Sequence, residues 1–190
     1  MNMNRIHRWY CRSSHWRNTV KSRLLPWALA GVELGDDLLE IGPGPGMTTD
    51  ELRKRVRRMT AVEIDPALAE SLSARMAGSN VEVICASATD IPLPDASVSA
   101  VVCFTMLHHV PSAALQDRLL GEAARVLKPG GVFAGSDSTT SWFFRQVHRG
   151  DTLVPVEPET FAPRLEAAGF RDVKVKRGSG AFRFRAFKPA

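Results

Sequence analysis

Cysteine is scarce in this sequence, which contains only Cys11, Cys85 and Cys103 among its 190 residues. The three lack the paired spacing of a zinc site or a redox motif, so no metal is expected. We interpret them as reduced, mostly buried thiols, which indicates a reducing compartment. Long apolar runs are also missing, because no segment approaches the ~20 residues of a membrane span or resembles a secretory signal. These absences favour a cytoplasmic location without a transmembrane segment, with at most weak contact to a membrane surface.

Acidic residues are absent before Glu33, whereas arginine and lysine recur throughout that stretch. The region 171–188 repeats this bias, with Asp172 as its only acidic residue. The formal net charge is +5 and the pI is about 9.5. Basic ends can meet nucleic acid, anionic lipid or an acidic substrate, but a solvated basic face is the commoner explanation. The 44% of hydrophobic and 24% of charged residues are typical of one globular domain.

The N-terminal stretch carries apolar and aromatic residues at steps of three, four or seven, with arginines between them, which is typical of an amphipathic helix. The residues in this pattern are Ile6, Trp9, Tyr10, Trp16, Val20, Leu24 and Trp27. We expect the helix to end near Pro26, because proline interrupts helical hydrogen bonding. Residues 1–30 are predicted to form a helical cap on a single domain at 31–190, in preference to a membrane-surface helix.

From Asp36 onward, short apolar runs alternate with helical patterns, which is typical of βαβ units with a parallel sheet. The predicted strands are Leu38–Ile41, Ala61–Ile64, Val81–Cys85, Val98–Phe104 and Val132–Gly135. The predicted helices are Thr48–Arg57, the segment from Pro66 to Gly78, Ala113–Leu127 and 157–168. Two more strands flank Gly178–Gly180 as a hairpin. The fold class is therefore α/β and Rossmann-like: a seven-stranded, mostly parallel sheet with helices on both faces and a C-terminal antiparallel hairpin.

Capping residues mark the predicted helix starts. Thr48 and Glu51 have the spacing of a capping box. Asp65 is a suitable N-cap followed by proline at the first helical position, and Ser112 begins the helix after the fourth strand.

The stretch "LLEIGPGPGMTTDEL" places three glycines after the first strand, where open α/β sheets bind ligands. Gly42, Gly44 and Gly46 lack Cβ atoms, so the backbone can turn tightly and approach a ligand. A dinucleotide loop needs G-x-G-x-x-G, and counted from Gly42 its third glycine is replaced by Met47. The loop therefore departs from the dinucleotide fingerprint.

Two carboxylates narrow the choice of ligand. Glu63, at the end of the second strand and about 20 residues after the glycines, can accept hydrogen bonds from both ribose hydroxyls. Glu40, beside the loop, would repel a pyrophosphate and favour a ligand with a cationic group. S-adenosylmethionine carries a ribose, a sulfonium and an ammonium, and is the cofactor that we predict.

Four motifs in order point to one family: "LLEIGPGPGMTT", "AVEIDPAL", "ASATDIPLPDASVSAVVCFTMLHHV" and "RVLKPGG". Together they resemble class I S-adenosylmethionine-dependent methyltransferases, nearest the group that includes quinone-biosynthesis C-methyltransferases. The likeness covers about residues 36–136 and is far more specific than the glycine loop alone. It implies that Gly42, Gly44 and Gly46 pack against the methionine part of the cofactor. It also implies that Glu40 binds the cofactor's ammonium, directly or through water, and that Glu63 holds the ribose diol.

The same resemblance assigns the adenine end of the site. Ile64 and Asp65 would flank the adenine, and Ser87 and Ala88 would contact its edge. Phe104, after the fourth strand, would lie at the lip of the cofactor site.

Two positions depart from the family pattern. Ser87 stands where the family often has aspartate, so one adenine contact becomes a neutral hydroxyl, which weakens the expected affinity. Ser99 stands where the group commonly has aspartate, in "ASVSAVV", and this change is interpreted as structural.

Methyl transfer from a sulfonium is an in-line displacement, so the enzyme mainly holds donor and acceptor in line and dry. Some acceptors also need a general base. His108, just past the fourth strand, is the preferred catalytic residue, and the neighbouring His109 lies where a base could also sit. Asp137 and His148 are weaker candidates.

The acceptor pocket is expected between the N-terminal helix and a segment rich in aromatic residues. Its predicted walls are Trp9, Tyr10, Trp142, Phe143 and Phe144, which suit a small, partly hydrophobic molecule. For any one of these residues, a purely structural role is equally compatible with the sequence.

Three alternatives stay open besides the small-molecule methyltransferase. The "GPGPG" loop is also similar to that of rRNA adenine dimethyltransferases, but their Asn-Pro-Pro-Tyr-type motif is replaced here by Cys103-Phe104-Thr105-Met106, which disfavours RNA. A non-catalytic S-adenosylmethionine-binding module would act through the basic ends of the chain. A nicotinamide-dependent oxidoreductase is opposed by Met47 and Glu40.

Overall fold

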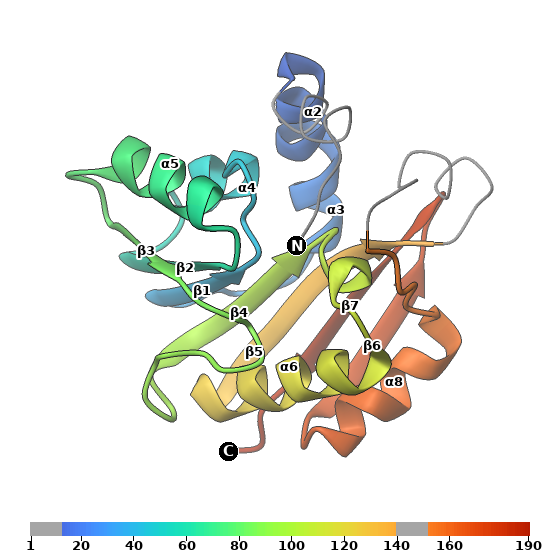
Figure 1. Cartoon of the computed structure of the whole chain (residues 1–190). Coiled ribbons are helices and arrows are strands. Elements are labelled where there is room, and N and C mark those ends of the chain that lie inside the picture. The colour runs from blue at the N-terminus through green and yellow to red at the C-terminus, as the bar shows by residue number, and fades with distance from the viewer. Residues whose placement is uncertain (1–12, 140–151) are drawn as a thin grey trace.

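A computed structural model describes residues 13–139 and 152–190 of the chain. Seven strands form one sheet in the order β3-β2-β1-β4-β5-β7-β6 (Figure 1). The first five pair in parallel, and β7 pairs antiparallel with both β5 and β6. This topology confirms the predicted Rossmann-like fold. The strands are β1 (Asp37–Ile41), β2 (Arg58–Glu63), β3 (Val81–Cys85), β4 (Val98–Phe104), β5 (Leu127–Ser138), β6 (Arg171–Arg177) and β7 (Ala181–Phe187).

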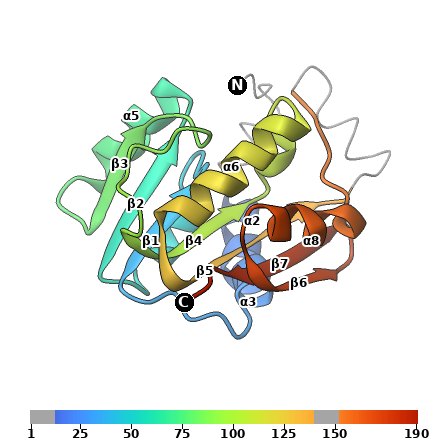
Figure 2. The same cartoon turned by 90° about the horizontal axis from the view of Figure 1, so that it is seen from below.

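Helices cover both faces of the sheet. The described helical elements are α2 (Ser14–Thr19), η1 (Val20–Leu24), α3 (Leu25–Ala28), α4 (Met47–Leu52), α5 (Pro66–Met76), η2 (Leu107–His109), α6 (Ala113–Val126) and α8 (Pro158–Ala167). Helices α6 and α8 lie on one face, while α2 and α3 lie on the other (Figures 1 and 2). Within the described residues, no helix has the length and apolar character needed to cross a bilayer.

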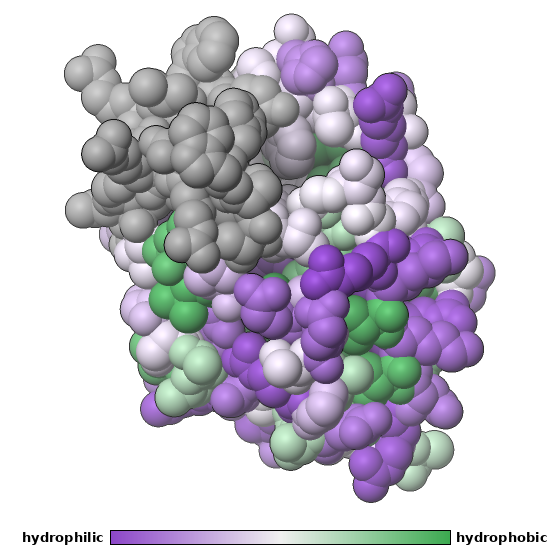
Figure 3. Space-filling view, turned by 90° about the vertical axis from the view of Figure 1, so that its right-hand side faces the viewer, coloured by the Kyte–Doolittle hydropathy of each residue, from purple (hydrophilic) through white to green (hydrophobic). Residues whose placement is uncertain are grey.

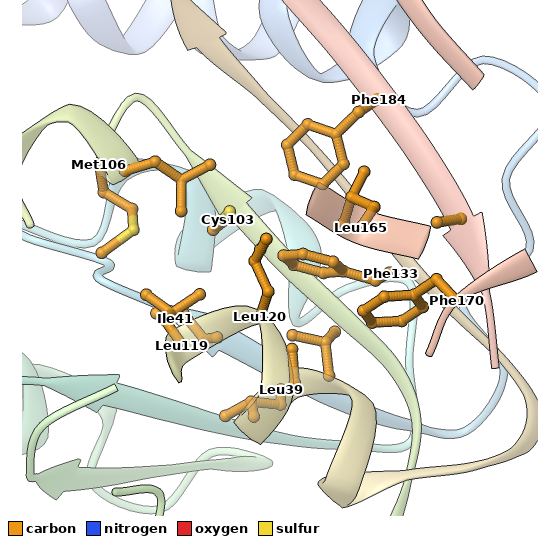
Figure 4. Close-up of a cluster of buried hydrophobic side chains, with 14 of the residues drawn as sticks. Leu39, Ile41, Cys103, Met106, Leu119, Leu120, Phe133, Leu165, Phe170 and Phe184 are labelled. Carbon is orange, nitrogen blue, oxygen red and sulfur yellow. The ribbon is translucent and has the colours of Figure 1, made fainter. Parts of the chain in front are cut away.

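Successive side chains of a strand point to opposite faces of the sheet, so the strands contribute to two hydrophobic clusters, one on each face. Leu39 of β1 and Phe133 of β5 belong to the cluster that packs under α6 and α8 (Figure 4). Leu38, the neighbour of Leu39, points to the opposite cluster, which contains Val20 and Leu25 of the N-terminal helical segment. The segment 13–28 is therefore anchored to the core through Val20, Leu25 and Ala28, whereas the predicted division of the chain at residue 30 stays a prediction.

Several element boundaries were predicted correctly and others were wrong. The strands β3 and β4 begin and end where predicted, and Asp65 and Ser112 cap α5 and α6 through hydrogen bonds from backbone N–H groups. The second strand begins earlier, at Arg58, and ends at Glu63. The fifth strand begins already at Leu127, which pairs with Val98 before the register shifts.

The N-terminal helical segment does not end at Pro26. It continues to Ala28 through a π-helical turn, in which the N–H of Leu25 donates to the carbonyl of Val20, five residues back. Pro26 lies at the start of the segment that follows. Pro26 itself has no N–H to donate to the π-helical turn before it.

The capping box predicted at Thr48 and Glu51 is wrong. Helix α4 begins at Met47 with Gly46 as its N-cap, and the Glu51 carboxylate accepts a hydrogen bond from Lys54 instead. The helix ends at Leu52, five residues before the predicted end. The amide of Asn80 donates to the carbonyls of Arg53 and Val56 at 2.9 and 3.0 Å, which fixes the chain in a turn there.

Candidate active site

The loop of residues 42–46 closes over the carboxyl ends of β1 and β2. Gly42 has a φ of 66°, and a Cβ there would lie 3.0–3.2 Å from side-chain atoms of Met106. Glycine is therefore required at this position by both backbone conformation and space. The N–H of Gly42 donates to the carbonyl of Val62 at 2.9 Å, which ties the loop to β2.

Glu63, the last residue of β2, holds this loop in place. Its Oε2 accepts a hydrogen bond from the N–H of Gly44 at 2.9 Å, and its Oε1 accepts one from the N–H of Asp65 at 2.9 Å. The side chain is buried. One carboxylate thus connects the glycine loop to the start of α5.

Two cavities meet at Glu63 and share Gly42 and Met106 as common walls. The first has a mixed lining: Trp16, Pro43, Gly44, Pro45, Met47, Thr48, Asp65, Leu68, Phe104, Thr105 and His109. The second is mostly apolar: Ile41, Val62, Ile64, Ala86, Ser87, Ala88, Thr89, Val110, Pro111, Leu115 and Leu119. The two cavities form the ends of one elongated site with a carboxylate in its middle.

Glu40 lies beneath this site rather than in it. It belongs to β1, is 1% exposed and lines neither cavity, so its predicted contact with the ammonium of the cofactor stays a prediction. Its Oε2 accepts a hydrogen bond from the Thr49 hydroxyl at 2.5 Å, and its Oε1 has no partner within the described part of the chain. Loss of solvation raises the pKa of this carboxyl to about 7, although the hydroxyls of Thr48 and Thr49 act in the opposite direction.

A family model described as a methyltransferase domain matches residues 39–135, which contain the glycine loop, Glu63 and the lining of both cavities except Trp16. The chain belongs to the class I S-adenosylmethionine-dependent methyltransferases. A 2-methyl-6-phytyl-1,4-hydroquinone methyltransferase of Oryza sativa is 31% identical over 170 residues, covering 86% of this chain and 49% of that protein. An rRNA adenine N-6-methyltransferase of Saccharopolyspora erythraea is 47% identical over 75 residues, covering 36% and 20%.

A solved structure of a methyltransferase from Aquifex aeolicus has a TM-score of 0.76, with 20% identity, and the match covers 98% of this chain and 99% of that one. This likeness concerns the fold. The chain spans from about a fifth to about half the length of the curated relatives it matches.

The two cavities collect most of the residues singled out in the sequence. Ile64, Ser87 and Ala88 line the apolar cavity, while Gly44, Asp65 and Phe104 line the mixed one, and Gly42 and Glu63 line both.

Gly46 lines neither cavity. Its φ is 80°, and a Cβ there would collide with Leu72 and Arg75 of α5. Gly46 therefore allows α5 to approach the loop rather than making room for a ligand.

The two histidines differ in position. His109 lines the mixed cavity, and its Nδ1 lies 3.2 Å from the carbonyl oxygen of Thr152. His108, the preferred base in the sequence, does not line it. Its ring is hydrogen-bonded through Nδ1 to Asp137, whose other oxygen accepts the backbone N–H of His108 at 3.0 Å. Both residues of this pair are buried, and the His108 ring lies 4.2 Å from that of His109.

Arg75 was missed in the sequence. From α5 it donates to the carbonyl of Pro45 at 2.8 Å and forms an ion pair with Asp50 of α4. It therefore provides a second attachment of the glycine loop, besides that of Glu63. No local pattern marks this residue, because its partners lie 25 to 30 positions earlier in the chain.

The two serines that depart from the family pattern both form hydrogen bonds within the chain. The Ser87 hydroxyl accepts the N–H of Thr89 at 3.2 Å and shares a hydrogen bond with the Thr89 hydroxyl at 2.8 Å. Ser99 lies away from the site. Its hydroxyl accepts the N–H of Asp37 at 3.0 Å and lies 2.8 Å from the carbonyl of Leu34, so it anchors the start of β1.

The predicted acceptor pocket falls mostly in two undescribed segments of the chain. The expected walls Trp9, Tyr10, Trp142, Phe143 and Phe144, and the candidate base His148, lie outside the described residues. Trp16, from the described part of the N-terminal segment, lines the mixed cavity.

Proposed function

We propose that this protein transfers the methyl group of S-adenosylmethionine to a small, partly hydrophobic acceptor. The observation that carries this proposal is the position of Glu63, a buried carboxylate at the junction of an apolar cavity and a mixed one. A nucleoside with an amino acid tail has the same order of groups: an apolar base, a diol, and a polar chain.

The residues fit the cofactor in that order. The apolar cavity, with Ile64 on one side and Ala88 on the other, suits the adenine. Each oxygen of Glu63 accepts one backbone N–H, and a carboxylate oxygen has a second lone pair, so both oxygens can still accept a ribose hydroxyl. The methionine part would follow the backbone of Gly42 and Gly44 into the mixed cavity.

The buried carboxyl of Glu40 also favours a cationic tail over a pyrophosphate. It lies below the loop that such a tail would cross, and a cation there would favour the ionised form of a carboxyl whose pKa burial raises to about 7. A phosphate placed there would face two carboxyl groups, Glu40 and Glu63. An ammonium would be attracted by both.

When bound, S-adenosylmethionine supplies an electrophilic methyl group on its sulfonium. The chain itself provides alignment and exclusion of water, for which Phe104 and Met106 form apolar walls. Where the acceptor must lose a proton, His109 is the described histidine that reaches the cavity, so we assign the role of base to it instead of His108.

Binding measurements test the cofactor assignment. We expect calorimetry to detect binding of S-adenosylhomocysteine and no tight binding of NAD. The variant Glu63→Gln keeps the side-chain volume but loses one acceptor oxygen, and should weaken S-adenosylhomocysteine binding by about 10- to 100-fold. Glu70→Gln, at an exposed position of α5, is the matched control and should leave the affinity unchanged. Tight NAD binding without S-adenosylhomocysteine binding would overturn the proposal.

A second experiment tests the acceptor class. The protein would be incubated with isotopically labelled cofactor and, in separate samples, a cell metabolite extract or total cellular RNA, and the labelled products identified by mass spectrometry. A labelled small molecule with apolar character is expected. Label found only in an RNA fraction would favour the rRNA-type alternative, to which the match with the Saccharopolyspora protein gives some support.

A further inference from the structure

One side of the molecule, formed by β6, β7 and the N-terminal helical segment, concentrates positive charge. Figure 3 shows this side, where hydrophilic side chains surround smaller hydrophobic areas. Lys174 pairs directly with Arg185 across the two strands, and Lys176 pairs with Arg183. Like charges directly opposite each other destabilise a sheet. The arrangement therefore carries a cost that an anionic partner would remove.

The four cations surround a cavity that also has an aliphatic wall. Ala28, Ala30, Val32 and Phe184 complete its lining, and no acidic residue is among its described lining residues. Two of the cations are fixed against the helical segment: Arg183 donates to the carbonyl of Trp27, and Arg185 donates to that of Gly31 at 3.0 Å. Their charge is held at the surface in a defined place.

An apolar groove of about 300 Å³ adjoins this cluster of cations. Its described lining includes Trp16, Leu24, Trp27 and Ala181, together with Arg23, and contains no acidic residue. Tryptophan next to arginine and lysine is typical of surfaces that lie in the headgroup region of a membrane. Trp16 lines both this groove and the mixed cavity of the active site.

We propose that this face binds the surface of a membrane that contains anionic lipids. The cations would meet lipid headgroups, and the groove beside Trp27 would lie at the level of the first acyl carbons. Nucleic acid is the other polyanion to consider, but the aliphatic side chains of Ala28, Ala30 and Val32 can neither stack on a base nor form hydrogen bonds with it. The guanidinium of Arg183 also lies 5.8 Å above the ring of Trp27, so that face of the ring is not available for stacking on a base.

The position of Trp16 gives this contact a consequence for catalysis, which rests on the proposed function. A membrane-dissolved acceptor could pass along the groove to the active site without crossing water. The membrane contact itself needs neither cofactor nor turnover, so it can be tested separately from methyl transfer.

The test is co-sedimentation of the full chain with phosphatidylcholine vesicles, with and without phosphatidylglycerol, at low and high salt. We expect binding only to the anionic vesicles, weakened by salt. In the double variant Lys174→Glu, Lys176→Glu, partitioning should fall by more than about 25-fold, because each basic side chain near an anionic surface contributes about fivefold. The same variant creates opposite-charge pairs with Arg185 and Arg183, so its Tm should be unchanged or higher.

The control is Arg55→Glu, Arg57→Glu, which changes the net charge equally at exposed positions between α4 and β2. It should reduce vesicle binding only a fewfold. Equal loss in both variants would overturn the proposal, because binding would then depend on net charge alone. Absence of vesicle binding would also overturn it and leave protection of the edge strand as the role of the lysines. Binding to an RNA homopolymer but not to vesicles would assign the face to nucleic acid.

Discussion

Replacing Glu40 by glutamine should change how the stability of the protein depends on pH. Burial raises the pKa of the Glu40 carboxyl from 4.5 to about 7 in the folded protein. The unfolded chain therefore releases this proton at lower pH than the folded one. Between these two pKa values the unfolded state binds fewer protons, so the contribution of Glu40 to stability is full below about 4.5, falls as pH rises, and is lost above about 7.

The size of the effect follows from the two pKa values. The difference between about 7 and 4.5, at ~1.36 kcal/mol for each pKa unit, gives about 3 kcal/mol. In Glu40→Gln this pH-dependent loss is absent. The variant should therefore gain about 3 kcal/mol relative to the parent protein between about pH 5 and about pH 8. For a domain of this size that corresponds to roughly 6–12 °C in Tm.

The assay is thermal unfolding of both proteins across this pH range, with Glu70→Gln as an exposed control. The quantity to follow is the difference in Tm between variant and parent. The contributions of all other groups, and any constant cost of the buried amide, cancel when this difference is compared between pH values. A difference that stays constant across the range would refute the argument, because Glu40 would then not titrate there.

Three further predictions concern the active site. For an acceptor that must lose a proton, His109→Asn should lower turnover by about 100-fold or more with little change in S-adenosylhomocysteine affinity, and normal turnover in steady-state kinetics would remove His109 as the base. His108→Asn should instead lower Tm, because the contact of His108 with Asp137 is lost. Arg75→Ala should weaken S-adenosylhomocysteine binding, measured by calorimetry, by about tenfold, because the carbonyl of Pro45 loses its hydrogen-bond donor. Unchanged affinity would show that the glycine loop keeps its conformation without Arg75. Gly42→Ala should lower the free energy of unfolding, measured by chemical denaturation, by about 1–2 kcal/mol, because alanine is strained at a φ of 66°. An unchanged free energy of unfolding would contradict the left-handed conformation of Gly42.

Elements with local chemical signals were predictable from the sequence. The strands β3 and β4 are compact apolar runs between polar or turn-forming residues, and their bounds match the prediction. The caps at Asp65 and Ser112 were also found, because an N-cap acts on N–H groups two or three residues away. Glu63 was singled out from its distance to the glycines, and it lines both cavities.

Features that depend on contacts between distant segments were not predictable. Helix α4 begins at Gly46, whose backbone lies against Leu72 and Arg75 of another helix. The choice between the adjacent histidines depended on which side of the short η2 helix faces the cavity, and spacing along the chain does not decide this. Glu40 was expected beside the ligand because it lies two residues before Gly42 in the sequence. Its burial, however, is produced by α4 packing over β1.

The two hydrogen bonds that Glu63 makes to backbone N–H groups have a thermodynamic consequence. The conformational entropy of the glycine loop is lost when the chain folds, not when a nucleoside arrives. A ligand that adds its own hydroxyls to this carboxylate finds its receptor already assembled, so little of its contact energy is spent on ordering the protein. The cost of preparing the site is thereby moved into the stability of the fold.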